Sequence, residues 1–326
     1  MEIQDTSDLC FPHLLNSSCR KPTLHWSEAV LLNSVLLFIS LITVVLNLLI
    51  IISVSHFRQL HTPTNILLLS LGVSDFFVGL LLMPFEIYRF TFCWFLGDVV
   101  CVFFCFLISN IISASIWNIV LISVDRYIAI CYPLHYPTRI SSTRVKYCVC
   151  LCWFCASFCS FFYSKDVMIH SGRSCIGECK FIISYFLGIF DLIFNFILPV
   201  TTIIVLYLRV SVVAVSQARA MRSHITVATF HSATSATKKS ELKAARTLGV
   251  LVVVYLTCYC PYYCYSLVDI NLISTSYASI LFFLFYANSC LNPVIYALFY
   301  PWFRKAVKVI VTLQILQPGS HEAKLL

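Results

Sequence analysis

Long apolar stretches separated by short polar segments dominate this chain of 326 residues. Seven of these stretches are long enough, at about 1.5 Å per residue in a helix, to cross a hydrocarbon layer roughly 30 Å thick. They lie near residues 30–55, 64–88, 98–131, 144–164, 182–209, 243–268 and 277–300. The pattern therefore predicts an all-α membrane protein with seven transmembrane helices in one bundle.

One bundle accounts for nearly the whole chain, so we expect three regions. Residues 1–29 form an N-terminal tail, residues 30–300 the transmembrane bundle, and residues 301–326 a C-terminal segment. The run Arg304-Lys305-Ala306-Val307-Lys308-Val309-Ile310 opens that last segment. Its alternation of basic and apolar residues predicts a short amphipathic helix on the inner membrane face.

The composition agrees with a membrane protein and sets the orientation. Hydrophobic residues make up 60% of the chain and charged residues 11%, against about a quarter charged in soluble domains. With the N-terminus outside, cytoplasmic segments hold sixteen of the 22 lysines and arginines, as the positive-inside rule requires. The net charge of +8 is then explained by basic side chains that face the anionic lipids of the inner leaflet, and no nucleic-acid partner is needed to explain it.

Several of the predicted spans contain polar groups that lipid would not tolerate. The second span carries Asp75, and the last carries two asparagines, a serine and Pro293. Polar side chains and freed backbone groups within a membrane must find partners inside the protein. We therefore expect an internal cluster made of the polar residues Asp75, Ser115, Asn288, Ser289 and Asn292.

Two motifs connect the chain to a known family. The last span ends in Asn292-Pro293-Val294-Ile295-Tyr296, and the third ends in Asp125-Arg126-Tyr127. They resemble the NPxxY and DRY motifs of rhodopsin-like (class A) G-protein-coupled receptors. The run from Asn288-Ser289 to Tyr300, Trp302 and Phe303 resembles the fingerprint of trace amine-associated receptors. This resemblance implies a multi-pass plasma-membrane protein with an extracellular N-terminus and a short helix after the seventh span.

The resemblance gives the polar cluster a function. In class A receptors the matching residues bind a sodium ion that stabilises the resting state, so the implied site is Asp75 with Ser115, Asn288, Ser289 and Asn292. The residues alone also allow a neutral, hydrogen-bonded Asp75 without an ion. We expect no other cofactor. The nearby cysteines of 148–152 alternate along a helix and point in diverging directions, which argues against a metal site.

The resemblance also implies an activation switch near the cytoplasm. Asp125 pairs with Arg126 at rest, and Glu241 on the sixth span completes an ionic lock. When the sixth span swings outward, Arg126 is released toward a heterotrimeric G protein. The other switch positions are aromatic residues and prolines on the third, fifth, sixth and seventh spans: Tyr127, Tyr207, Tyr255, Tyr259, Pro261, Pro293 and Tyr296. The family usually has Trp at position 259 and Phe at position 255, so the usual packing of the switch is in doubt here.

The usual amine-binding residue is missing. Amine receptors of this class hold the ammonium group with an aspartate eighteen residues before the DRY arginine, where this chain has Ile108. Asp191 is a candidate replacement, because it lies eight residues before Pro199 on the fifth span, about 12 Å nearer the outside. Apolar and aromatic neighbours suit ammonium binding by charge pairing and cation–π contact. Many fish trace amine-associated receptors resemble this pattern. A protonated Asp191, or one bonded to a neighbouring helix, remains the alternative.

The other expected pocket residues line the outer halves of the third, sixth and seventh spans: Ile108, Ser109, Ile112, Tyr262, Tyr263 and Tyr286. Two acidic residues, Glu86 and Asp269, lie near the outer rim of their spans. Either would suit the second charge of a polyamine, but simple solvation at the rim is the expectation we favour.

Six of the 17 cysteines fall in segments predicted to be external, where disulfides form: Cys10, Cys19, Cys93, Cys101, Cys175 and Cys179. Six cysteines allow fifteen pairings. The resemblance implies Cys101–Cys179, and for the tail Cys10–Cys175 and Cys19–Cys93. Asn16-Ser17-Ser18 in the same tail is a glycosylation sequon.

The resemblance implies a chemosensory receptor for amines that acts through a stimulatory G protein and cyclic AMP, and that is not an enzyme. A class A receptor for a non-amine ligand is the first alternative, because Ile108 permits it. A transporter or channel is the second, although the odd number of spans and the lack of repeated halves argue against it.

Overall fold

The computed structural model of the protein describes residues 9–14, 17–21, 26–170, 175–224, 249–265, 267, 275–322 and 325. Within them the chain is almost entirely helical, with only isolated β-bridges near the N-terminus. Three residues singled out from the sequence, Asn16, Glu241 and Asp269, lie outside the described residues.

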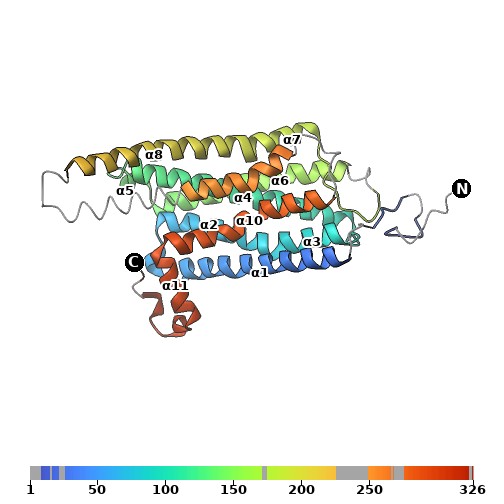
Figure 1. Cartoon of the computed structure of the whole chain (residues 1–326), viewed down its shortest axis with the longest axis horizontal. Helices are drawn as coiled ribbons and strands as arrows, with labels where there is room; N and C mark the ends of the chain where they lie inside the picture. Colours follow the sequence, from blue (N-terminus) through green and yellow to red (C-terminus); the bar gives the residue numbers. More distant parts are fainter. Residues whose placement is uncertain are drawn as a thin grey trace.

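The seven predicted spans are present as a bundle of long helices (Figure 1). The first, third and fourth spans are α1 (Trp26–His56), α4 (Gly97–Cys131) and α6 (Ser142–His170). The second span consists of α2 (Pro63–Phe77), η3 (Val78–Leu82) and α3 (Met83–Thr91), and the fifth consists of α7 (Tyr185–Asp191), η5 (Leu192–Ile197) and α8 (Leu198–His224). The sixth span is the helix Gly249–Tyr265, and the seventh is α10 (Thr275–Phe299). Six of them are long and apolar enough to cross a membrane, and the described part of the sixth span, Gly249–Tyr265, is a shorter apolar helix. The fold prediction is confirmed.

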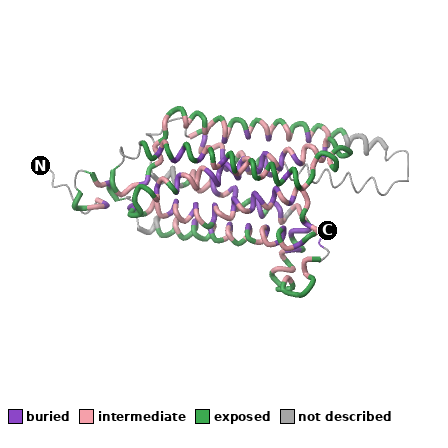
Figure 2. Tube along the Cα trace, turned by 180° about the vertical axis from the view of Figure 1, so that it is seen from behind, coloured by how far each residue is buried: buried purple, intermediate pink, exposed green. Residues whose placement is uncertain are grey.

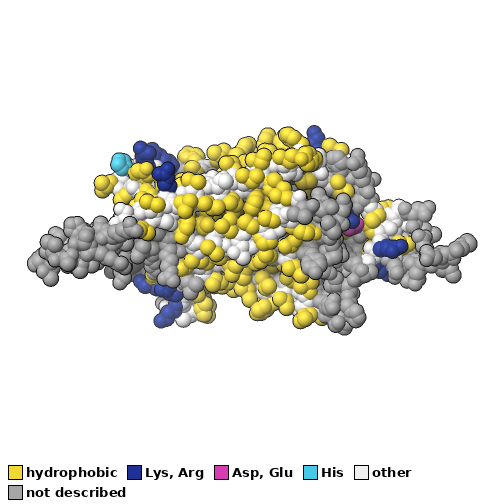
Figure 3. Space-filling model, turned by 45° about the horizontal axis from the view of Figure 1, so that its top comes forward, with side chains coloured by type: hydrophobic (Ala, Val, Ile, Leu, Met, Phe, Trp, Pro, Cys, Tyr) yellow, Lys and Arg dark blue, Asp and Glu magenta, His cyan; other side chains and the backbone are white. Residues whose placement is uncertain are grey.

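The third span, α4, lies at the centre of the bundle and packs against α2, α6 and α8. Its buried side chains continue over most of its length, whereas α1 and α6 expose large apolar residues along their outer faces (Figure 2). On the face shown in Figure 3, hydrophobic side chains form an apolar belt across the middle of the molecule, and Lys and Arg side chains lie toward its ends. A soluble protein would not expose such a surface, so the belt is the lipid-facing side of a membrane bundle.

Two of the spans contain a π-helical turn in the middle of the membrane segment. In the second span it is η3, directly before Met83-Pro84, and in the fifth it is η5, directly after Asp191 and before Pro199. Proline cannot donate a backbone hydrogen bond and crowds the preceding turn, so a wider turn before it relieves the clash. In the fifth span this turn sets the direction of the residues beside the candidate ligand site.

The seventh span is followed by the expected amphipathic helix, α11 (Pro301–Val311). Tyr300 is extended, and the chain turns away from the bundle there (Figure 1). One face of α11 buries Trp302, Phe303 and Ala306, while Arg304 and Lys305 are exposed. The short helices η7 (Gln314–Leu316) and η8 (Ser320–Glu322) then lead the chain back to η2 (Arg58–Leu60) after the first span, where His56 hydrogen-bonds Ser320.

Three disulfides close the opposite end of the bundle, and two differ from the expected pairing. Cys101–Cys179 is present as expected, but the N-terminal tail forms Cys10–Cys93 and Cys19–Cys175. The expected Cys10–Cys175 and Cys19–Cys93 are therefore wrong.

The reason lies in the path of the tail. Leu9 and Arg20 form an antiparallel bridge that brings Cys10 beside Cys19, so either cysteine can reach the same loops. A second bridge, between Ser18 and Ile176, runs parallel and places Cys19 beside the loop that follows α6. Spacing along the sequence contains no information about this register.

Candidate functional site

Asp191, the candidate amine-binding residue, is the last residue of α7 and faces polar groups from two other helices. Asn195 donates a hydrogen bond of 2.8 Å to its Oδ1 from one turn further along the fifth span. The Tyr163 hydroxyl on α6 donates a hydrogen bond of 3.3 Å to the backbone carbonyl of Leu187, and Tyr163 and Tyr263 of the sixth span both lie beside the Asp191 carboxylate. All three neighbours are neutral, and in the described part of the chain no lysine or arginine pairs with Asp191. A carboxylate that is ordered by neutral donors can still accept a ligand cation.

Aromatic rings extend from Asp191 across the bundle. Tyr263 stacks on Phe196 at 4.5 Å between ring centroids and meets Tyr262 edge-on at 5.2 Å. Tyr262 in turn contacts Phe282 of the seventh span at 5.2 Å. We call Tyr263, Tyr262 and Phe282 the aromatic row. Its ring faces are the kind of surface that binds ammonium groups.

The expected pocket residues of the third span lie on α4 and differ in their burial. Ile112 is buried and Ile108 is partly buried against the apolar core. Ser109 accepts a hydrogen bond of 3.0 Å from Ser160 of α6, so its hydroxyl is engaged with a neighbouring helix. An apolar side chain at position 108 offers no charge to a ligand.

Tyr286 is bonded to an acid that the sequence placed at the rim. Its hydroxyl donates a hydrogen bond of 3.2 Å to Glu86, which is fully buried and forms an ion pair of 2.7 Å with Arg89. Solvation of Glu86 at the rim, the favoured expectation, is therefore wrong. The spacing Glu-x-x-Arg places the two residues on one helix face and was the signal for this pair.

The polar cluster of the second, third and seventh spans forms around Asp75. Hydroxyls of Ser115 and Ser289 donate to its Oδ1 at 3.2 and 2.7 Å, and the Asn292 amide donates to its Oδ2 at 2.8 Å. Asn292 also donates to Asn288 at 3.0 Å. Every member is buried, and in the described residues no basic side chain pairs with Asp75.

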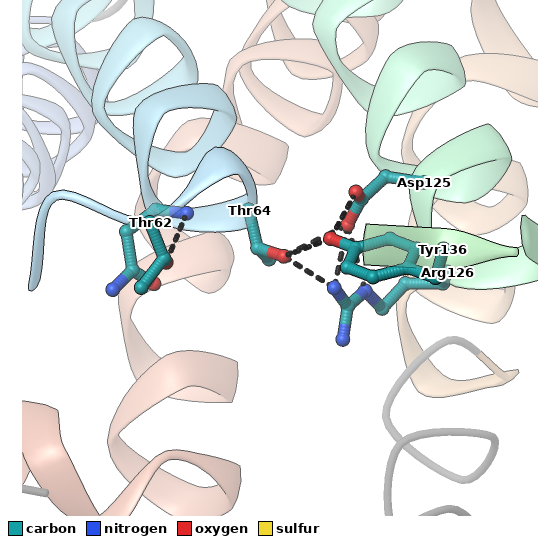
Figure 4. A network of polar contacts seen from close by, with 6 residues as sticks. Thr62, Thr64, Asp125, Arg126 and Tyr136 are labelled. Atoms are coloured by element: carbon teal, nitrogen blue, oxygen red, sulfur yellow. Dashed lines mark hydrogen bonds and ion pairs between the residues drawn. The ribbon is translucent and has the colours of Figure 1, made fainter. Parts of the chain in front are cut away.

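At the other end of the third span, Asp125 and Arg126 form an ion pair of 2.6 Å (Figure 4). Thr64 donates a 2.9 Å hydrogen bond to the same carboxylate and accepts one from Arg126. Tyr136, in the short helix α5 (Tyr136–Arg139), donates to Asp125 at 2.8 Å. Burial raises the pKa of the Tyr136 hydroxyl, which keeps this donor protonated.

Thr64 and Tyr136 were not among the residues singled out from the sequence. Thr64 lies 61 positions before Asp125, and two residues earlier Thr62 caps the start of α2 (Figure 4). A threonine near the start of a helix is usually explained by a local N-cap interaction, so nothing in the sequence connects Thr64 with the third span.

The aromatic switch residues pack in two groups. Tyr255 and Tyr259 of the sixth span stack at 4.6 Å, and Tyr259 meets Phe285 of the seventh at 4.4 Å. Tyr259 is 1% exposed, so a tyrosine fills this position without leaving the site open. Nearer the Asp125 end, Tyr296 contacts Tyr300 at 6.0 Å.

Comparison with known proteins agrees with this arrangement. Residues 46–296 match the family of 7 transmembrane receptors (rhodopsin family). The chain is similar to Trace amine-associated receptor 13c of Danio rerio, with 39% identity over 98% of this chain and 97% of that receptor. It is also similar to Trace amine-associated receptor 1 of Mus musculus, with 35% identity over 92% and 95%, and to Trace amine-associated receptor 7e of Rattus norvegicus, with 35% identity over 98% and 92%.

Proposed function

This chain belongs to the rhodopsin family of seven-transmembrane receptors and, within it, to the trace amine-associated receptors, and on that premise we propose that it binds the ammonium group of its ligand at Asp191. Membership of a receptor family sets aside the transporter, channel and enzyme alternatives. The observation that supports Asp191 most is its position: a carboxylate among neutral hydrogen-bond donors, next to an aromatic row.

The third span supports the same choice by exclusion. Ile108 stands where the usual ammonium-binding aspartate would be, and an isoleucine cannot pair with a desolvated cation. The amine therefore binds between the fifth and sixth spans, with its charge on Asp191 and its apolar part against Tyr263 and Tyr262.

We further propose that the ligand signal reaches a stimulatory G protein and raises cyclic AMP. At rest Arg126 is held by Asp125 and Thr64, and Tyr136 holds the same carboxylate. An agonist that favours the open form of the bundle frees Arg126 for the G protein. The G-protein type follows from the family resemblance of the sequence.

The orientation that fits this function places the disulfides outside the cell. An extracellular compartment is oxidising, which suits the bonds Cys10–Cys93, Cys19–Cys175 and Cys101–Cys179. The amphipathic helix α11 then lies at the inner face of the plasma membrane with its basic side chains toward anionic lipids.

The Asp75 cluster fits a sodium ion. Its groups are a buried carboxylate with no basic partner among the described residues, two hydroxyls and two amides, and such oxygen-rich sets suit hard cations. Asp75, Ser115, Ser289, Asn288 and Asn292 would hold the ion, which would supply the positive charge that the carboxylate lacks.

The test of the amine site is a cyclic AMP assay in cells that express the receptor with a panel of primary, tertiary and di-amines. Asp191→Asn keeps the size of the side chain and removes its charge, so we expect at least about a hundredfold loss of potency for every amine that activates the wild type. Asp191→Glu is the matched control that restores the charge.

Ile108→Asp adds the usual aspartate and should restore part of the response in the Asp191→Asn background. Surface expression is measured in parallel. An unchanged amine response of Asp191→Asn at normal surface level would exclude Asp191 as the ammonium site.

A further inference from the structure

A second carboxylate lies near the proposed amine site, but it already carries a cation. Glu86 is fully buried in α3, and Nε of Arg89, three residues later, lies 2.7 Å from its Oε2. The Arg89 side chain is itself only 10% exposed. Two opposite charges that are both withdrawn from water stay ionised only as a pair, so the two side chains neutralise each other.

Arg89 is fixed by groups from three parts of the fold. Its Nη1 donates a hydrogen bond of 3.1 Å to the backbone carbonyl of Cys179, the cysteine that ties the loop after α6 to the third span. Its guanidinium carbon lies 4.3, 4.9 and 5.7 Å from the ring centroids of Phe90, Phe181 and Phe282, respectively. Aromatic faces at such distances stabilise a cation. The surroundings of Arg89 are therefore those of an ammonium-binding site, already filled by the protein.

This filled site and the proposed amine site are at the two ends of the aromatic row. Phe282 is within cation–π distance of Arg89 and contacts Tyr262, while Tyr263 contacts Tyr262 and lies beside Asp191. Tyr286, which bonds Glu86, contacts Phe285, and Phe285 contacts Tyr262 at 5.1 Å. A ligand that lies along the row has Asp191 at one end and the Glu86–Arg89 pair at the other.

The charges at the two ends differ. Asp191 has only neutral partners among the described residues, whereas Glu86 has its charge cancelled by Arg89. We propose that Arg89 is an internal cation that stands in the place of a second ammonium group, so that this receptor selects monoamines over diamines. In this view Glu86 is a second ammonium-binding residue that Arg89 keeps occupied. The inference rests on the proposed amine site at Asp191 and extends it to the class of ligand.

Electrostatics gives the direction of the selection. A diamine bound through one ammonium at Asp191 brings its second ammonium toward the guanidinium of Arg89. Two like charges a few ångströms apart repel strongly in a site from which water is withdrawn. A monoamine of the same length places only a methyl group there, against Phe282 and Tyr262.

The test compares hexylamine with hexamethylenediamine, which differ only in the second amino group, and repeats the comparison with shorter and longer homologues. The readout is the ratio of the two potencies in the cyclic AMP assay, corrected for surface expression. For the wild type we expect the monoamine to be at least about tenfold more potent, a factor that corresponds to one ordinary charged contact. A wild type that prefers the diamine at any length would overturn the proposal.

Variants separate repulsion by Arg89 from binding by Glu86. Arg89→Gln removes the cation and exposes the carboxylate, so the ratio should move by about tenfold or more toward the diamine. The double variant Glu86→Gln/Arg89→Gln removes both charges and should move the ratio by less, because the repulsion is gone but no second carboxylate is present. Arg89→Lys keeps the cation and should retain the wild-type preference.

The outcomes are distinct. The proposal fails if Arg89→Gln reaches the surface and leaves the ratio of monoamine to diamine potency unchanged. It also fails if the ratio moves toward the diamine as far in the double variant as in Arg89→Gln. In both cases the amine site at Asp191 stands. If Arg89→Gln does not reach the surface, the double variant decides, because a ratio equal to that of the wild type excludes repulsion by Arg89. An unchanged amine response of Asp191→Asn at normal surface level would reject the amine site itself, and the selection with it.

Discussion

Tyr207 of the fifth span lies directly against Gly249 of the sixth. A Cβ atom built on Gly249 would be 2.8 Å from the Tyr207 hydroxyl oxygen and 3.0 Å from its Cε2. No side-chain carbon fits there without movement, so the missing side chain of Gly249 allows the two spans to approach at the end of the bundle near Asp125. We interpret it as a contact that an outward movement of the sixth span would break.

Gly249→Ala should therefore raise signalling without ligand. The added methyl group pushes the sixth span away from Tyr207, in the direction of the outward swing that the family resemblance associates with activation, at a cost of about 1–3 kcal/mol to the resting form. Basal cyclic AMP per receptor at the surface measures the effect. The same change in a Tyr207→Ala background, where the ring is absent, should have little effect, and equal increases in both backgrounds would contradict the explanation.

Removal of the Tyr136 hydroxyl should also favour the active form. Tyr136→Phe deletes the 2.8 Å hydrogen bond to Asp125 and leaves the ring in place. A hydrogen bond to a charged group contributes about 1.5–3 kcal/mol, so we expect the equilibrium to shift toward the active form, and basal activity with it, by roughly tenfold or more. Thr64→Val, which loses the bonds to Asp125 and Arg126, should act in the same direction. A decrease in basal activity for both variants would show that these bonds support the active form instead.

The Asp75 cluster should make the receptor sensitive to sodium. Replacement of sodium chloride by choline chloride should raise agonist potency several-fold in membranes with the wild type, because the ion favours the resting form. Asp75→Asn removes the charge and should abolish the dependence, and Ser289→Ala should weaken it. The decisive result against a sodium site would be equal wild-type potency in the two salts.

The disulfide pairing can be checked with double variants. Cys10→Ser/Cys93→Ser removes both halves of one bond and should lower surface expression no more than either single change. Cys10→Ser/Cys175→Ser breaks two bonds and should lower it further, since each native disulfide contributes about 2–5 kcal/mol. Peptide mapping under non-reducing conditions gives the direct answer, and a Cys10–Cys175 peptide would restore the pairing expected from the sequence.

The sequence predicted the spans and the Asp75 cluster because both follow from a local rule. An apolar stretch of sufficient length must be a helix in the membrane, and the polar groups within it must turn toward one another. Most helix bounds agree within a few residues where they are described, but α6 continues to His170 and α8 to His224, beyond the predicted ends near 164 and 209. Asp75 is bonded to three of the four predicted partners.

The parts that could not be predicted depend on contacts between distant segments. Thr64 meets Asp125 across two spans, and Cys19 finds Cys175 only because the tail forms a bridge to the loop after α6. The solvated rim position predicted for Glu86 is wrong for another reason, because the partner Arg89 lies one turn away on the same helix and allows the carboxylate to be buried. A charged pair one turn apart on a helix can be buried together, whereas a single charge at the same depth belongs in solvent.

The π-helical turn η5 has a consequence for how the fifth span tolerates a change of length. It accommodates one residue more than an α-helix would between Asp191 and Pro199. In-frame loss of a single codon in Leu192–Ile197 would return the segment to regular α-helix and leave Asp191 facing Tyr263, because the wider turn absorbs one residue. Loss of one residue from the regular helix between η5 and the sixth span's contacts would instead rotate Asp191 by about 100° away from Tyr263. The turn is thus the place in the fifth span where one residue can be gained or lost while the carboxylate keeps its direction.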